Sequence, residues 1–190
     1  MNNSELYYEK TKDNSPRPLL LKALPFVHTK EHALDIGSGA LNDSKYLLSN
    51  GFKKVTALDK WQIPDPLPIF PDSTFEYIIS SFEDFEFPLA VYDFVNAQFS
   101  LPFISPTEFS RVFQSILQSL KTGGIFSGQL FGDRDDWNSN PRMTFHTRAQ
   151  GISLFEEMHT IHFEEEEKDE NTAIGVLKHW HFFNFIIKKC

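Results

Sequence analysis

One stretch of this chain decides its fold: Ala33-Leu34-Asp35-Ile36-Gly37-Ser38-Gly39-Ala40-Leu41-Asn42-Asp43-Ser44. A short apolar run carries an acid, turns at a Gly-x-Gly sequence and continues into what reads as a helix. In open α/β sheets, ligands bind just beyond the carboxyl ends of the strands, and glycines let the backbone approach them closely. A helix N-terminus presents free N–H groups to a carboxylate or phosphate. The stretch therefore predicts a strand, a ligand-binding turn and a helix.

A second strand ends in an acid and points to a nucleoside ligand. Residues 54–59 read as this strand, and Asp59 lies 22 positions beyond Gly37. In nucleotide-binding βαβ units, a carboxylate meets the ribose hydroxyls at a spacing of about 20 residues. A carboxylate suits this task because it accepts two hydrogen bonds from a diol. Asp59 is therefore a candidate ribose ligand.

Five further segments have the composition of strands and alternate with helical segments. The last two are joined directly, which is the geometry of an antiparallel hairpin. The expected strands cover residues 33–36, 54–59, 77–81, 92–98, 125–131, 160–166 and 179–187. This order predicts an α/β fold: a Rossmann-like, seven-stranded, mostly parallel sheet with helices on both faces and an antiparallel C-terminal hairpin.

Two helices carry clear start signals. Capping boxes are expected at Ser105 with Glu108 and at Thr147 with Gln150, and these helices extend to about residues 120 and 157. Pro106 suits the first helical position after Ser105. Further helices are expected up to residue 24 and over 44–49, whereas the prolines of residues 61–71 prevent a regular helix there.

Composition limits the partners and the compartment. The net charge of −8 disfavours a broad electrostatic footprint on nucleic acid. The only cysteine is Cys190, so no intrachain disulfide can form and a reducing compartment is favoured. The run Leu19-Leu20-Leu21 is far too short for a membrane span. We expect one cytoplasmic domain over residues 1–190, with an N-terminal arm and helix over 1–29 and a Rossmann-like core over 30–190.

These motifs resemble those of class I S-adenosylmethionine-dependent methyltransferases. The turn at Asp35-Ile36-Gly37-Ser38-Gly39 is similar to their first motif, and Leu120-Lys121-Thr122-Gly123-Gly124-Ile125-Phe126 is similar to the start of their fifth strand. The resemblance implies an enzyme that uses S-adenosylmethionine to methylate a small-molecule acceptor by in-line displacement. A narrower likeness to small tellurite-resistance-type methyltransferases rests on Asn96-Ala97-Gln98-Phe99-Ser100-Leu101-Pro102-Phe103, Gly132-Asp133-Arg134-Asp135-Asp136-Trp137 and Lys178-His179-Trp180-His181.

The resemblance also implies roles for single residues. The glycine turn holds the methionine end of the cofactor, Asp35 meets its amine, and Asp59 binds its ribose. Residues at the ends of the second and third strands surround the adenine. In this family an acid often holds the adenine amino group, and here Ser81 stands at that place with Glu83 and Asp84 just after it. The implied cofactor-binding set is Asp35, Gly37, Ser38, Gly39, Asp59, Lys60, Trp61, Ser81, Phe82 and Ala97.

The acceptor is expected beyond the fourth and fifth strands, where ligands bind in such sheets. The substrate candidates are Phe99, Arg134, Trp137 and His146, with His179 and His181 as further pocket residues. No general base stands out, and a thiolate, amine or soft anion needs none. The catalytic candidates are His146, Arg134 and Tyr8. Tyr8 belongs to residues 1–15, which form either a loose arm or a flap over the site.

Two other function classes stay open. A nicotinamide-dependent oxidoreductase is disfavoured because its third fingerprint glycine is replaced by Asn42. The second function class is a non-catalytic module that binds S-adenosylmethionine or its product. Leu41 departs from the methyltransferases, many of which have a glycine at that position. No metal site is expected, since His159 and His162 face opposite sides of a strand. His179 and His181 would share a face, but no acidic third ligand can be assigned to them from the sequence. Residues 96–99 lack the motif of amino-directed DNA methyltransferases.

Overall fold

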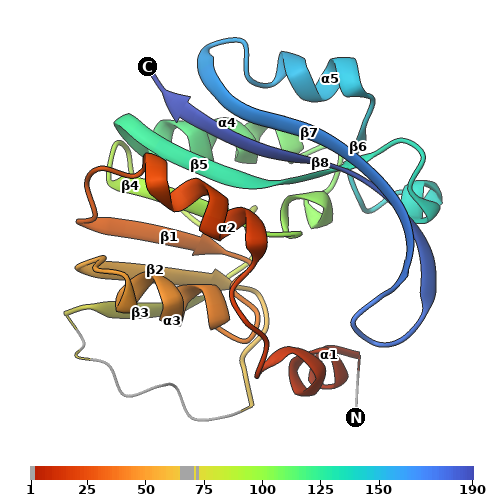
Figure 1. Ribbon diagram of the computed structural model, residues 1–190, viewed down its shortest axis with the longest axis horizontal. Coiled ribbons are helices and arrows are strands. Elements are labelled where there is room, and N and C mark those ends of the chain that lie inside the picture. Colours follow the sequence, from red (N-terminus) through yellow and green to blue (C-terminus); the bar gives the residue numbers. More distant parts are fainter. Residues whose placement is uncertain (1–2, 65–70, 72) are drawn as a thin grey trace.

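The computed structural model describes residues 3–64, 71 and 73–190 (Figure 1). Most of the expected loop at residues 61–71 therefore lies outside the described residues. Within the described ranges, no helix has the length and apolar character that crossing a bilayer requires. The helices are α1 (Asn3–Thr11), α2 (Pro18–Ala23), α3 (Asn42–Ser49), α4 (Phe109–Ser119) and α5 (Arg148–Ser153), with 3₁₀ turns η1 (Leu24–Phe26), η2 (Leu101–Phe103) and η3 (Asp136–Ser139).

One sheet organises the molecule, with strand order β3-β2-β1-β4-β5-β8-β7. Strands β1 to β5 run parallel, and β8 and β7 add antiparallel pairings at the far side. This confirms the predicted fold class. The sequence did not reveal β6, a two-residue strand parallel to the end of β5. The strands are β1 (His32–Ile36), β2 (Lys54–Asp59), β3 (Phe75–Ile79), β4 (Tyr92–Ala97), β5 (Leu120–Gly132), β6 (Phe145–His146), β7 (Met158–Asn171) and β8 (Leu177–Lys189).

The central strands β1 and β4 are buried on both faces of the sheet. Neighbouring residues of a strand point to opposite sides. Ala33 belongs to the cluster that packs under α2 and α3, whereas Leu34 belongs to the cluster under α4. Phe94 and Val95 divide in the same way. The apolar stripe of α4 consists of Phe109, Val112, Phe113, Ile116 and Leu117, all buried. Helices therefore cover both faces, as the alternation predicted.

The start of α4 differs from the prediction. The helix begins at Phe109, and residues 106–108 form a turn in which the N–H groups of Glu108 and Phe109 both donate to the Ser105 carbonyl. The capping box at Ser105 is absent because the Glu108 carboxylate pairs with Arg111 (2.7 Å). In contrast, the box at Thr147 forms as predicted, although α5 ends at Ser153. Strand β3 also ends two residues before the predicted residue 81.

The C-terminal hairpin is longer than the sheet that it joins. Strand β8 pairs with β5 only over Phe182–Lys188, whereas the β7–β8 ladder continues to Asn171 and Leu177. The free part curves away from the sheet toward α1 (Figure 1). It thereby forms a roof over the carboxyl ends of the parallel strands.

Candidate active site

The glycine turn has the backbone geometry that a closely approaching ligand requires. Gly37 and Gly39 have φ values of +70° and +50°. A Cβ atom on Gly37 would lie 2.4 Å from the Cβ of Ser100, so no larger residue fits. Leu41 also adopts the left-handed conformation, with φ +64°, while its side chain is fully buried. The turn thus keeps the backbone conformation of a third glycine although the residue is leucine.

Asp59 is oriented by the turn itself. Its Oδ2 accepts a hydrogen bond from the N–H of Gly39 (2.9 Å), and its Oδ1 accepts one from the N–H of Trp61 (3.0 Å). Each carboxylate oxygen keeps acceptor capacity beyond one bond, so the group can still receive two hydroxyls. The side chain lines the main cavity of the protein.

A pair of buried carboxyl groups lies below the turn. Asn96 donates through one Nδ2 to Asp35 (2.9 Å) and to Asp43 (3.0 Å), and Ser44 Oγ donates to Asp35 (2.5 Å). Burial, followed by the nearby charge of Asp43, raises the pKa of Asp35 to about 7. Burial also raises the pKa of Asp43. This negative pair suits a cationic group bound above it.

The main cavity has a volume of about 1330 Å³ and lies between the strand ends, α1 and the hairpin. It brings together ten of the predicted site residues: Tyr8, Gly37, Gly39, Asp59, Lys60, Trp61, Ser81, Phe82, Phe99 and Trp137. Asp35 and Ser38 line an adjoining smaller cavity of about 320 Å³, which shares Gly37 and Gly39. Helix α1 thus forms part of the wall rather than a loose arm.

Two buried hydroxyls at the turn suit a polar ligand. Ser38 and Ser100 are buried, and their Oγ atoms have no hydrogen-bond partner within the described part of the chain. Buried polar groups are nearly always hydrogen-bonded. The residues present therefore suit a polar ligand seated on the glycine turn.

Five predicted residues lie outside the linings of both cavities: Ala97, Arg134, His146, His179 and His181. Ala97 is buried in the core under α4. The His146 ring packs on Phe109 at 4.8 Å between centroids, and burial lowers its pKa to about 4. His146 is therefore a neutral, packed side chain near pH 7.

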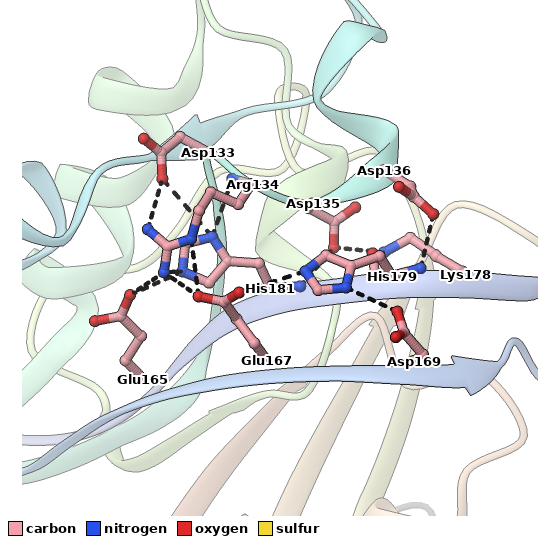
Figure 2. Close-up of polar contacts among 10 residues, drawn as sticks. All are labelled: Asp133, Arg134, Asp135, Asp136, Glu165, Glu167, Asp169, Lys178, His179 and His181. Atoms are coloured by element: carbon pink, nitrogen blue, oxygen red, sulfur yellow. Dashed lines mark hydrogen bonds and ion pairs between the residues drawn. The ribbon is translucent and has the colours of Figure 1, made fainter.

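Arg134 points to the outer face of the hairpin, where it joins an ionic cluster (Figure 2). Its Nε donates to Glu167 (2.8 Å), and one terminal nitrogen donates to Glu165 (2.6 Å). Its backbone N–H donates to Nδ1 of His181 (3.0 Å). Single ligand atoms of Glu165, Glu167 and His181 lie within 4.8 Å of one another, a spacing that suits a metal ion, but the Arg134 guanidinium bonds to this group. The sequence had not indicated this grouping.

A second ion pair ties the hairpin to the loop after β5. The Lys178 ammonium pairs with Asp135, and both side chains are buried. The ammonium also lies 3.8 Å from the ring centroid of Trp180 and 4.4 Å from that of Trp137. The cation–π contacts and the ion pair fix both tryptophan rings, which line the main cavity.

A row of side-chain amides crosses the sheet beneath the cavity, and sequence reasoning missed it. Gln98 donates to Asn96 (2.8 Å), and Gln129 donates to both Gln98 (3.1 Å) and Asn184 (3.0 Å). Asn184 in turn donates to Glu166. These residues lie in, or directly after, the adjacent strands β4, β5, β8 and β7. The available signal was the presence of buried amides inside otherwise apolar strands.

The comparisons with known proteins agree with this site. A family model described as a methyltransferase domain matches residues 34–127. No curated protein matches the sequence. The structure is similar to that of TehB from Haemophilus influenzae, with TM-score 0.75 and 12% identity over 97% of this chain and 66% of that chain.

Two further solved structures are similar. One is the 1,6-didemethyltoxoflavin-N1-methyltransferase of Burkholderia thailandensis, crystallised with 1,6-didemethyltoxoflavin and S-adenosylhomocysteine (TM-score 0.71, 19% identity, 91% of this chain and 77% of that chain). The other is the N-methyltransferase NodS of Bradyrhizobium japonicum WM9 with S-adenosylhomocysteine (TM-score 0.61, 12% identity, 99% of each chain).

The sheet order, the glycine turn and the acidic strand ends define a Rossmann-like methyltransferase fold. Residues 34–127 match the methyltransferase-domain family, and the chain shares its fold with solved S-adenosylmethionine-dependent methyltransferases. This chain spans 66% of the TehB chain, so the similarity concerns the fold and not the activity of TehB.

Proposed function

We propose that the protein transfers a methyl group from S-adenosylmethionine to a small-molecule acceptor bound under the hairpin. One observation carries this proposal: a single cavity of about 1330 Å³ runs from Gly37 and Asp59 to the aromatic residues below the hairpin. A pocket for one small ligand measures about 300–1,000 Å³, so this cavity has room for two reactants. Two of the similar structures carry S-adenosylhomocysteine, one together with a small heterocyclic compound.

The proposed cofactor position follows the cavity walls. The methionine end lies on Gly37, Ser38 and Gly39, with its ammonium facing the carboxyl pair that includes Asp35. The ribose hydroxyls reach Asp59. In this position, the unpartnered hydroxyl of Ser38 gains a hydrogen-bond partner.

The adenine is proposed to lie between Trp61 and Phe82, at the other end of the cofactor groove, with Lys60 beside it. The Ser81 hydroxyl already donates to Asp84 (2.7 Å), and Asp84 does not line the cavity. Glu83 does line it, which makes Glu83 the better acid for the adenine amino group. Ala97 supports this region from the core through its backbone only.

When bound, the cofactor supplies an activated methyl group on its sulfonium. The protein has to align the acceptor with that methyl group and exclude water. Phe99, Trp137 and Trp180 form the aromatic wall of the acceptor space, while α1 and the hairpin cover it. Of the three catalytic candidates, only Tyr8 lines the cavity. Arg134 and His146 are therefore assigned to the support of the hairpin and the core.

We further propose that residues 1–190 act as one unit. Residues 1–29 supply a cavity wall through Tyr8 and a core contact through Leu20, while residues 30–190 supply the sheet. The single exposed thiol at Cys190 supports a cytoplasmic location. The likeness to TehB supports the narrower assignment to the tellurite-resistance-type group.

Isothermal titration with S-adenosylmethionine, S-adenosylhomocysteine and NADH tests the proposal. We expect both adenosyl ligands to bind and NADH not to bind. Asp59→Ala should weaken adenosyl binding at least tenfold, because two hydrogen bonds to a charged group are lost. Glu157→Ala, which removes an exposed acid far from the cavity, should leave binding unchanged. Binding of NADH alone would contradict the proposal.

Binding does not by itself separate an enzyme from a non-catalytic sensor. That distinction requires acceptor-dependent formation of S-adenosylhomocysteine, followed by mass spectrometry of the methylated product. Tight binding of both adenosyl ligands without turnover across thiols, amines and oxyanions would favour the sensor.

A further inference from the structure

The hairpin presents three acids to the main cavity: Glu164, Glu166 and Glu170. Alternation along β7 places these acids on the cavity side and Glu165, Glu167 and Asp169 on the other. Two of the three acids have cations beside them. Glu164 lies 3.6 Å from Lys22, and Glu170 lies 2.6 Å from Lys168. Glu166 has no ionic partner within the described residues.

The only hydrogen bond found for Glu166 in the described part of the chain comes from Asn184, and it engages Oε1. The other oxygen, Oε2, is thus available to a ligand. Because Glu166 is only partly buried and lines the cavity, it brings a negative charge to the acceptor space. Lys168, two residues further along the same face of β7, pairs with Glu170 (2.6 Å) rather than with Glu166.

The amide row fixes the direction of that hydrogen bond. Carboxyl groups stand at both ends of the row, Asp35 at one end and Glu166 at the other, and each accepts a hydrogen bond from the neighbouring amide. One amide in between must therefore donate both ways, and that amide is Gln129. Its own oxygen is occupied by the N–H of Phe99 (2.9 Å). Asn184 consequently has its oxygen toward Gln129 and its NH₂ toward Glu166.

Aromatic rings line the cavity next to this carboxylate. Phe99 meets Phe182 at 5.2 Å and Trp180 at 6.0 Å between ring centroids, both in edge-to-face geometry. Phe182 is the β8 residue paired with Glu166 in the hairpin register. A ligand that packs against Phe182 therefore lies beside Glu166. Aromatic rings favour an aromatic ligand, and the carboxylate favours a hydrogen-bond donor on that ligand.

We propose that the acceptor is a flat aromatic or heteroaromatic compound with an N–H group, and that Glu166 binds this N–H group and takes its proton. This inference rests on the proposed methyltransferase function. The nitrogen lone pair forms a bond to the methyl carbon while the carbon–sulfur bond breaks, and its electron pair stays on sulfur as the thioether of S-adenosylhomocysteine. The N–H proton passes to Glu166 and then to water. Glu166 is thus a substrate-binding and catalytic residue, whereas Asn184 and Gln129 position it.

Titration of the protein saturated with S-adenosylhomocysteine tests this inference with two probes of similar shape. One is 2-aminobenzimidazole, which is flat and has N–H donors on its edge. The other is 1-benzothiophene-2-carboxylate, which is flat and anionic. We expect the first to bind and the second not to bind. Glu166→Gln should weaken 2-aminobenzimidazole at least tenfold, because a hydrogen bond to a charged acceptor is lost.

The matched control is Asp169→Asn, which makes the same chemical change on the opposite face of β7. It should leave the affinity for 2-aminobenzimidazole within twofold of the native value. In Glu166→Gln, the new amide oxygen still accepts from Asn184, so the affinity for S-adenosylhomocysteine should also stay unchanged.

The outcomes separate the two proposals. Loss of S-adenosylhomocysteine binding in the native protein would refute the proposed function itself. Normal S-adenosylhomocysteine binding with no binding of 2-aminobenzimidazole would overturn only the acceptor class. The inference would be equally overturned by tighter binding of the anionic probe, or by an unchanged affinity in Glu166→Gln.

Discussion

Replacement of Lys178 by methionine tests how the acceptor wall is held. The Lys178 ammonium is paired with Asp135, whose side chain is fully buried, and it lies within 5.0 Å of three aromatic ring centroids. Methionine is one atom shorter than lysine and can still pack its apolar side chain against the rings, but it removes the charge. The Asp135 carboxylate would then remain buried with two backbone N–H donors, from Trp137 and His181, and no cation.

Removal of one partner of a buried ion pair costs about 3–5 kcal/mol, mainly because the other charge is left without compensation. We therefore expect Lys178→Met to lower the free energy of unfolding by about 4 kcal/mol, a large share of the roughly 5–15 kcal/mol typical of a domain. Lys168→Met is the control, because its pair with Glu170 is exposed and should contribute no more than about 1 kcal/mol.

Urea unfolding followed by tryptophan fluorescence gives these free energies, since Trp137 and Trp180 report directly on the region. The double variant Lys178→Met with Asp135→Asn removes both charges, so its cost should be smaller than the sum of the single costs by at least about 1 kcal/mol. A cost for Lys178→Met below about 1 kcal/mol, or strictly additive single costs, would refute the reasoning.

Four further predictions concern the turn and pH. Gly37→Ala should abolish S-adenosylhomocysteine binding in titration and cost at least about 2 kcal/mol in urea, because its Cβ would meet Ser100 at 2.4 Å with φ at +70°. Leu41→Gly should relieve the backbone strain of a leucine in the left-handed conformation. It should still lower the free energy of unfolding by about 2 kcal/mol or more, since a fully buried side chain is lost. Equal or greater stability in urea would contradict this. The pKa of Asp35 rises on folding from 3.8 to about 7, chiefly through burial, so its contribution to stability is present below pH 4 and is lost as pH rises through 7. Asp35→Asn should remove this fall of stability with rising pH, measured as the urea midpoint between pH 4 and 8. The pKa of His146 falls on folding from 6.5 to about 4 through burial, so its contribution is lost as pH falls below 6.5, and His146→Phe should remove this opposite slope.

The sequence determined the features that depend on neighbours along the chain. Strand β2 has the bounds that its apolar run predicted, and the box at Thr147 forms because its partner Gln150 is one helical turn away. The glycine turn was recognisable because only its residue types permit that backbone. The mostly parallel sheet and its antiparallel C-terminal hairpin then followed from the alternation of elements and from the short final connection.

Other features depended on which of several possible partners a side chain contacts in the folded chain. The box at Ser105 failed because Arg111 offered Glu108 a stronger partner than a backbone N–H. A position after a strand places a residue at an edge of the sheet but leaves the direction of its side chain open. Trp137 therefore reached the cavity, while Arg134, three residues earlier, turned to the acids of β7.

The acceptor side of the site was decided by tertiary structure alone. Glu166 belongs to an acidic run that reads as a solvated strand end, and nothing in its neighbours distinguishes it from Glu165. The register of β7 on β8 places it opposite Phe182, and the curvature of the hairpin brings that face over the cavity. In a strand, a shift by one residue exchanges the two faces, so only the pairing of the folded chain could select which acid meets the acceptor.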